Sequence, residues 1–364
     1  MHDLALSKFD RLDTDLAVGN EHRLANPVSI AAEYAVDGDH PGDEHSHVVM
    51  GWLLGDGTDA RSLLEAYLLQ SVLLEHGGSP LRAALETTDL GDAPSELCGL
   101  DDSTREMTLT AGLEGTTAAN ADAIEALILG VLESIVKHGV PAETVRSSLH
   151  QLELSQREVG GDHFPYGLNL MLRAMGPALH GGDPVAMLDI EHELELLGKR
   201  AEDKNFIPGL VRTLLLDNGH RVRLVMSPST DLTAQREQAV RDRLREMKDA
   251  MSAQDRAQLV ELAGALEQRQ DMVDDADCLP SVGIEDVPED VAIPTGDLGT
   301  IGTHRATWFG AGTNGLVYSR IITELPTLGD ELGPLLPLYC DLAPDVDCAG
   351  RDYQTNQAYQ ASVV

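Results

Sequence analysis

The sequence predicts an α+β fold: a strand-and-helix domain, then a helical hairpin, then an incomplete second α+β unit. Three observations predict it. Several short segments alternate apolar and polar residues, which is the period of a half-buried strand. Other segments carry apolar residues three and four positions apart, which is the period of an amphipathic helix. Near position 230 the composition changes to mostly Asp, Glu, Arg, Gln and Ala, and the strand signals stop.

The first domain is expected over residues 46–228, after a polar, turn-rich stretch at 1–45. Alternating apolar residues predict strands at 48–54, 107–113 and 222–226. Apolar stripes predict helices at 64–72, 80–85, 124–135, 145–152, 168–175, 187–197 and 206–216. Asn120 and Pro141 precede two of these stripes and are residues typical of helix starts.

A helical hairpin is expected over residues 229–273. Apolar residues step by four and three along 240–251 and again along 259–266. Ser252 lies between the two runs and is expected to cap the second, with Asp255 three residues on in place of the usual Glu or Gln. We interpret the pair as a solvated, charged connector.

The last part, residues 274–364, is expected to begin with an extended linker, because Pro280, Pro288 and Pro294 punctuate it. Strands are predicted at 305–309 and 316–322, and a helix from Asp330 onward. These elements are too few for a complete domain, so we expect the truncated start of a further α+β unit.

The charge balance excludes several partners. Lys and Arg total 26 and Asp and Glu total 61, so the net charge is 26 − 61 = −35. Nucleic acid and anionic membrane surfaces both require a basic face. No apolar run approaches the roughly 20 residues of a membrane span, and the N-terminus lacks a signal-peptide pattern. We expect a cytoplasmic protein.

Most of the basic residues are arginines, and lysine is scarce. An acidic, lysine-poor surface keeps a protein hydrated in concentrated salt, whereas at ordinary ionic strength its charges repel one another. We therefore expect a salt-loving host.

The cysteines show no metal-binding pattern. Cys98, Cys278, Cys340 and Cys348 contain no Cys-x-x-Cys pair, and seven residues separate the last two, which fits no usual zinc spacing. We expect buried free thiols rather than ligands or a disulfide.

The segment His40–His47 is the most tempting metal motif. A zinc peptidase of the inverted type needs His-x-x-Glu-His on one helix, so that both imidazoles share a helix face and the Glu polarises water. One extra residue separates the first His from Glu44, and a Pro-Gly pair disfavours a helix. We expect a solvated loop, with adventitious metal binding by His45 and His47 as the alternative.

The segment Gly310–Gly315 matches the dinucleotide-binding pattern Gly-x-Gly-x-x-Gly. That chemistry needs a strand before the motif and a helix after it. β-type residues follow instead, and Asn314-Gly315 is a strong hairpin signal. We expect a turn; the alternative, a dinucleotide-dependent oxidoreductase, rests on this motif alone.

The remaining polar candidates favour structural roles. Ser79 lacks the Gly-x-Ser-x-Gly pattern of a nucleophile and is expected to start a helix with Pro80. The histidines at 150, 163, 180, 192 and 220 show no paired spacing of four, and Glu191, Glu193 and Glu195 are expected to form a solvated helix face. We therefore predict no catalytic, cofactor-binding or metal residue.

Several segments, in order along most of the chain, share the motifs of one family. They are Leu73–Leu81 (LLEHGGSPL), Cys98–Leu100, His150–Glu158 (HQLELSQRE), His180–Pro184 (HGGDP), Leu214–Asn218 with His220–Val222, and Thr313–Tyr318 (TNGLVY). Together they resemble the presequence-protease branch of the pitrilysin/insulinase zinc peptidases.

In that family, four related α+β domains form two halves that a helical hairpin joins, and the halves close around an unfolded peptide. The resemblance implies that 46–228 is the second domain, 229–273 the hairpin and 274–364 the opening of the third. It implies that Ser7–Asp13 belongs to the tail of the first domain, which carries the zinc motif. No position here matches that motif, so no catalytic or metal residue is transferred.

The resemblance implies the non-catalytic central portion of a zinc metalloendopeptidase that degrades unfolded peptides in a closed chamber. Zinc belongs to the complete parent enzyme, and the chain alone is expected to be inactive. Expected partners are peptide substrates of the complete enzyme and a separately encoded zinc-bearing domain. The alternative is a zinc-free peptide-binding or partner subunit of a split peptidase, whose edge strands pair with an extended peptide.

Overall fold

The computed structural model describes residues 10, 14, 17–37, 42–159, 165–189, 191–273, 281–290 and 293–363. The chain forms two compact units. The first contains Met1–Thr230 together with Thr313–Val364, and the second contains Asp231–Gly312.

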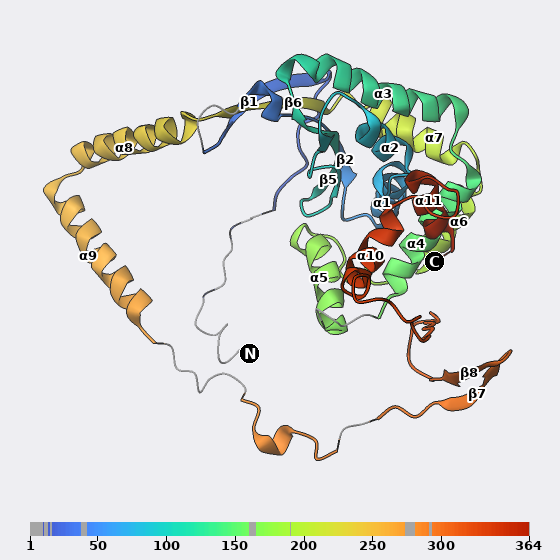
Figure 1. The fold of residues 1–364 in the computed structure, drawn as a ribbon. Helices are drawn as coiled ribbons and strands as arrows, with labels where there is room; N and C mark the ends of the chain where they lie inside the picture. The colour runs from blue at the N-terminus through green and yellow to red at the C-terminus, as the bar shows by residue number, and fades with distance from the viewer. Residues whose placement is uncertain are drawn as a thin grey trace. The chain divides into compact units, whose positions relative to one another are not determined.

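A mixed sheet organises the first unit (Figure 1). Its strands are β1 (Val28–Ala35), β2 (Ser46–Asp56), β3 (Ala93–Pro94), β4 (Gly99–Asp101), β5 (Glu106–Thr116) and β6 (Arg221–Ser229). They lie in the order β1-β6-β2-β5-β3, and β4 also pairs with β5. β1 is parallel to β6, and the other pairings are antiparallel. The three predicted strands are confirmed as β2, β5 and β6.

β1 was not predicted, and it lies ahead of position 46, where the sequence places the start of the domain. Every residue of β1 except Tyr34 is exposed, so burial imposes no clear alternation on the sequence. Its register with β6, from Val28 opposite Val222 to Ala35 opposite Ser229, nevertheless makes it the edge of the same sheet.

The core lies between one face of the sheet and the helices. Val48, Met50 and Trp52 alternate along β2 and are almost completely buried, as are Leu109 and Leu113 of β5. Antiparallel pairing aligns the two rows. Burying such side chains stabilises the fold by roughly 1.5–3 kcal/mol each. The indole N–H of Trp52 donates to the carbonyl of Leu215, 3.0 Å away, so the buried polar atom is satisfied.

The helices of this part are α1 (Ala60–Leu74), α2 (Pro80–Thr87), α3 (Ala121–His138), α4 (Ala142–Arg157), α5 (Tyr166–Leu179), α6 (Glu191–Ala201) and α7 (Phe206–Val211). A π-helical turn at Arg212–Leu216 follows α7. Pro80 is the first residue of α2, as predicted. Asn120 precedes α3 but does not cap it, because its side-chain amide donates to the carbonyl of Leu90 instead. None of the described helices is long and apolar enough to cross a membrane.

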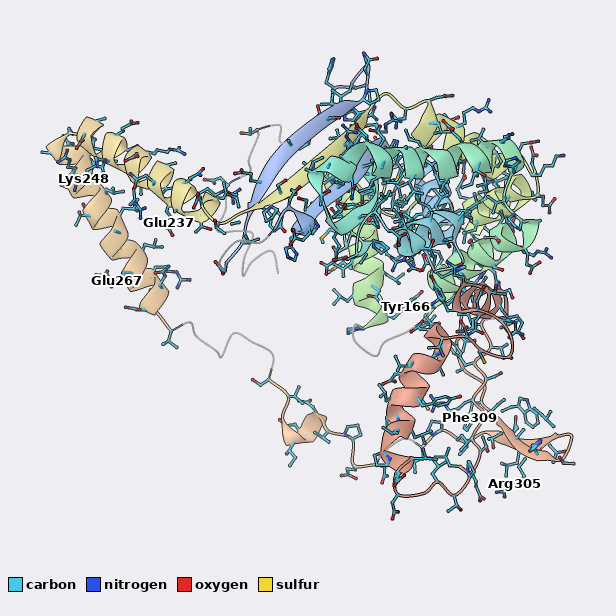
Figure 2. The ribbon with its side chains drawn as sticks, turned by 45° about the horizontal axis from the view of Figure 1, so that its top comes forward. Tyr166, Glu237, Lys248, Glu267, Arg305 and Phe309 are labelled. Atoms are coloured by element: carbon cyan, nitrogen blue, oxygen red, sulfur yellow. The ribbon has the colours of Figure 1, made fainter. Side chains whose placement is uncertain are left out.

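In the second unit, α8 (Leu232–Ala250) and α9 (Ala253–Asp271) are the two predicted helices. The predicted cap is confirmed: Ser252 accepts a hydrogen bond from the N–H of Asp255, whose carboxylate accepts one from the N–H of Ser252. The hydrogen bonds with Ser252 lower the pKa of Asp255. Figure 2 shows charged side chains along the pair, among them Glu237, Lys248 and Glu267. A hairpin of β7 (Asp297–Ile301) and β8 (His304–Trp308) follows, and β8 matches the strand predicted at 305–309.

The rest of the chain, residues 313–363, differs from the expectation. The strand predicted at 316–322 does not form, and Val317, Ile321 and Ile322 are 88–90% exposed. No strand pairs with this segment in the described part of the chain, and an isolated strand is not stable in water. α10 (Leu336–Leu342) forms where a helix was expected after Asp330, and α11 (Tyr353–Val363) was not predicted.

Candidate functional site

The described part of the His40–His47 segment forms no α-helix, in line with the prediction. His40 and Pro41 lie outside the described residues. Asp43–His45 form a short 3-10 turn, and His47 lies in β2. The His47 ring meets the ring of Tyr34 edge to face, with centroids 5.2 Å apart. Its Nδ1 lies 3.9 Å from a carboxylate oxygen of Glu114. Glu44 and His45 therefore lie in a short turn and not on the helix that the zinc motif needs.

The glycine motif forms the predicted turn. Asn314 and Gly315 both have positive φ, at 52° and 84°, and the N–H of Leu316 donates to the carbonyl of Thr313. Extended, unpaired chain follows the turn rather than a helix. The motif therefore lacks the helix N-terminus that binds a pyrophosphate.

The other polar candidates have structural partners. Ser79 is fully buried at the start of α2, and its hydroxyl donates to the carbonyl of Ser71. His220 accepts a hydrogen bond from the N–H of Leu24 through Nδ1, at 3.1 Å. Glu191 and Glu193 pair with Arg157 and Arg61, so that helix face is partly ion-paired rather than simply solvated. His163 lies outside the described residues.

In the described ranges, no group of three or more His, Cys, Asp or Glu side chains is placed to hold a metal ion. The described residues therefore do not fit the zinc site that the resemblance implies for the parent enzyme.

The cysteine prediction is wrong for two residues. Cys340 and Cys348 are exposed, whereas Cys98 is half-buried, and all three are free thiols. Cys278 lies outside the described residues. Burial raises the pKa of the Cys98 thiol, whose sulfur lies 3.4 Å from the carbonyl oxygen and 3.3 Å from the nitrogen of Gly112.

A partly open cavity of about 300 Å³ lies between α1, the loop after β4 and α5. Its polar side chains bind one another. The Tyr67 hydroxyl donates to Asp102, and Arg173 donates to Gln156. Burial and the bond to Asp102 raise the pKa of Tyr67 well above its usual value. Thr58, Ser103, Thr104 and His180 also line the cavity.

The exposed edge of β1 is the candidate site that sequence analysis missed. In the described part of the chain, no strand pairs with the outer edge of β1, so its backbone groups on that side are free to pair. Eight residues at about 3.3 Å each give roughly 26 Å of edge. Val28, Ile30 and Ala32 alternate onto one face, beside Val222, Leu224 and Met226 of β6.

A groove of about 470 Å³ lies on the other face of β1, between the strand and the start of α3. It is lined by Ser29 and Ala31 of β1, Ala118 and Ala119 before α3, and Arg223 of β6. Arg223 is bound by Asp122 and Glu125. Asp122, which also lines the groove, and Arg223 pair with each other, and the rest of the lining is uncharged, so it suits an extended peptide better than a charged small molecule.

Comparisons with known proteins agree with the sequence motifs. Residues 226–363 match the family of domains associated with subfamily C of the M16 peptidases. The chain is 28% identical over 362 residues to the mitochondrial presequence protease of Xenopus tropicalis, covering 99% of this chain and 35% of that protein. It is 29% identical over 328 residues to presequence protease 1 of Arabidopsis thaliana, covering 87% of this chain and 30% of that protein.

Solved structures of lower similarity were also found. The periplasmic protease PqqL from Escherichia coli matches with a TM-score of 0.41 and 14% identity, over 62% of this chain and 23% of that one. A peptidase M16 inactive domain from Pseudomonas fluorescens matches with a TM-score of 0.39 and 15% identity, over 58% and 47% of the two chains. The chain spans about a third of the length of the curated relatives it matches.

Proposed function

We propose that this chain is the non-catalytic central portion of a zinc endopeptidase. The chain belongs to the presequence-protease branch of the pitrilysin/insulinase-type peptidases. The complete enzyme degrades unfolded peptides inside a closed chamber. In this role the sheet and helices of the first unit form part of the chamber wall, and the α8–α9 pair acts as the hinge.

The observation that carries this proposal is the extent of the similarity. It covers 99% of the chain but only 35% of the Xenopus tropicalis presequence protease. A shared hairpin or a single motif would produce a short match, whereas this one includes the sheet, its helices and α8–α9. In this proposal the zinc chemistry lies in the rest of the enzyme.

The net charge of −35 supports a basic substrate. The relatives are named presequence proteases, and organelle targeting peptides are Arg-rich and poor in acidic residues. A strongly acidic wall raises the local concentration of such peptides and speeds their capture. We propose basic, unstructured peptides as the substrate class.

Translation of the DNA on both sides of this coding region tests the proposal. We expect a His-x-x-Glu-His motif upstream, in the same frame or in a separate neighbouring gene, and further α+β sequence downstream. A separate gene indicates a split enzyme with a zinc-bearing partner. Absence of the motif from the whole genome contradicts the proposal.

A second candidate function is a zinc-free peptide-binding subunit, and the free edge of β1 favours it. An extended peptide that adds a strand there is held by main-chain hydrogen bonds. Fluorescence anisotropy with a labelled, unstructured basic peptide measures this binding. A peptide of the same sequence with alternate backbone nitrogens methylated should lose it, and equal binding of both peptides excludes strand addition.

A further inference from the structure

Helix α11 lies against the turn between α1 and α2 and against α4 (Figure 1). The turn, Glu75–Ser79, belongs to the LLEHGGSPL segment, and α4 contains the HQLELSQRE segment. The free edge of β1 involves neither of these two motifs. Their contacts with α11 give them a structural role of their own.

The two glycines of the turn allow close approach of α11. A Cβ atom on Gly78 would lie 2.8 Å from the backbone oxygen of Gln354 and 3.0 Å from the Cβ of Ala358. A Cβ atom on Gly77 would lie 2.8 Å from the side-chain oxygen of Gln357. Neither glycine has a positive φ, so the backbone conformation does not itself require glycine. The nearest atoms belong to α11, and His76 Nδ1 lies 3.0 Å from the Gly78 position and a Glu86 carboxylate oxygen 3.0 Å from the Gly77 position.

Hydrogen bonds fix the helix in this position. The N–H of Gly77 donates to the side-chain oxygen of Gln357 at 2.7 Å. At the far end of α11, the side-chain amide of Gln151 donates to the carbonyl of Ala361 at 3.3 Å. The contact therefore runs along the helix, from the turn to α4.

The segment that ends in α11 is folded as a small unit. Asn356 is only 4% exposed, and its amide donates to the carbonyls of Pro344 and Val346. Gln360 donates to the carbonyl of Pro344 at 2.9 Å. The guanidinium of Arg351 lies 3.9 Å from the centre of the Tyr359 ring. The segment from 343 to 363 is therefore held together by its own contacts as well as by those to the turn and α4.

The C-terminal end of α4 binds a second part of the same returning chain. The Asn314 amide donates to the carbonyl of Arg157 at 3.2 Å, and the Tyr318 hydroxyl donates to Glu158 at 2.7 Å. Both residues lie in the TNGLVY segment. Three of the segments that carry the family resemblance therefore meet on one surface.

We propose that the Glu75–Ser79 turn and α4 form a docking surface whose occupant is helix α11 of the same chain. The surface selects a helix with a glutamine that accepts the Gly77 N–H and a small residue, Ala358, opposite Gly78. It fastens the polypeptide that follows the second unit to the rest of the first unit. This inference does not depend on the peptidase role.

Amide hydrogen exchange of the full chain, followed by mass spectrometry, tests the docking. The variant Gly78→Ala places a methyl group against the backbone of α11, and we expect exchange in 354–363 to accelerate at least tenfold. Exchange in β2 and α3 should not change, which shows that the domain remains folded. The matched control is Gly130→Ala, because Gly130 has open space around it and should leave α11 exchange unaltered. Unchanged α11 exchange in Gly78→Ala overturns the proposal.

Gln357→Ala provides a second test that introduces no bulk. It removes the acceptor of the Gly77 N–H, and we expect faster exchange in α11 by a smaller factor than in Gly78→Ala. Repeating the wild-type measurement at several protein concentrations identifies the occupant. Protection independent of concentration supports docking within one chain. Protection that grows with concentration shows that a second copy supplies the helix, and it overturns the inference.

Discussion

Cys98 differs from the other described cysteines in how its thiol is enclosed. It is half-buried beside Gly112, whereas Cys340 and Cys348 are exposed. Burial raises the Cys98 pKa, which lowers the fraction of reactive thiolate. We predict that iodoacetamide at about pH 8, near the usual thiol pKa, modifies Cys340 and Cys348 first and Cys98 at least roughly tenfold more slowly. Peptide mapping measures the rates, and modification of Cys98 at the rate of the other two contradicts the enclosure.

His76 couples the Glu75–Ser79 turn to pH. Its Nδ1 accepts a hydrogen bond from the N–H of Gly78 at 3.1 Å, which requires the neutral ring, and burial lowers the His76 pKa. The carboxylates of Glu75, Glu86 and Asp345 and the guanidinium of Arg82 line the same cavity.

The unfolded chain therefore binds this proton more readily than the folded chain. The stabilising contribution of His76 is complete above its unfolded pKa of about 6.5 and is lost as the pH falls below that value. Urea unfolding of wild type and His76→Gln at about pH 7.5 and 5.5, on either side of that pKa, measures it. We predict that the free energy of unfolding decreases less between about pH 7.5 and 5.5 in the variant than in wild type. Equal decreases contradict the assignment of this pH dependence to His76.

Several residue roles were predictable from the sequence because they depend on near neighbours. The Ser252–Asp255 cap and the Ser79-Pro80 helix start need only residues three positions away. The exposure of Cys340 and Cys348 was not predictable in this way, because it depends on which distant segments cover them.

At the scale of elements, α3 shows how a local pattern is reinforced by packing. Ile124, Ile128 and Leu132 form a fully buried stripe, whereas Gly130 lies on the exposed side. No atom outside the helix lies within 4 Å of a Cβ placed there. Gly130→Ala should therefore raise the free energy of unfolding by roughly 0.5–1 kcal/mol. Urea denaturation measures the change, and a destabilised variant contradicts the open environment of Gly130.

Strands were predicted less completely than helices. β2, β5 and β6 carry buried rows or half-buried residues, so their alternation is visible in the sequence. β1 is exposed along almost all its length, and the register with β6 defines it rather than its own pattern. The segment 316–322 shows the reverse case. Its residues favour a strand, but no described strand pairs with it.

At the scale of the whole molecule, the excess of 35 negative charges governs stability in salt. These charges repel one another across the folded surface, and salt screens the repulsion. We predict that the melting temperature rises between about 0.1 M and 2 M KCl, where the Debye length falls from about 10 Å to a few Å or less. Differential scanning calorimetry measures it. A melting temperature that does not depend on KCl contradicts adaptation to salt.

The candidate site was only partly predictable at this scale. The family motifs could be recognised in the sequence. The structure explains three of them: α11 docks on α4 and the Glu75–Ser79 turn, and the Asn314–Tyr318 segment binds the end of α4. This docking surface brings together residues more than 200 positions apart in the sequence, such as Gln151 and Ala361. A single sequence contains no information about such pairs, because neither residue constrains the type of its neighbours.

In the proposed function, this chain serves as scaffold within a peptidase. Metal analysis of the purified chain, combined with a cleavage assay on an unstructured basic peptide with and without a chelator, tests it most directly. If the chain is scaffold, we expect less than stoichiometric zinc and no chelator-sensitive cleavage. One tightly bound zinc per chain together with repeated, chelator-sensitive turnover of the peptide would contradict it.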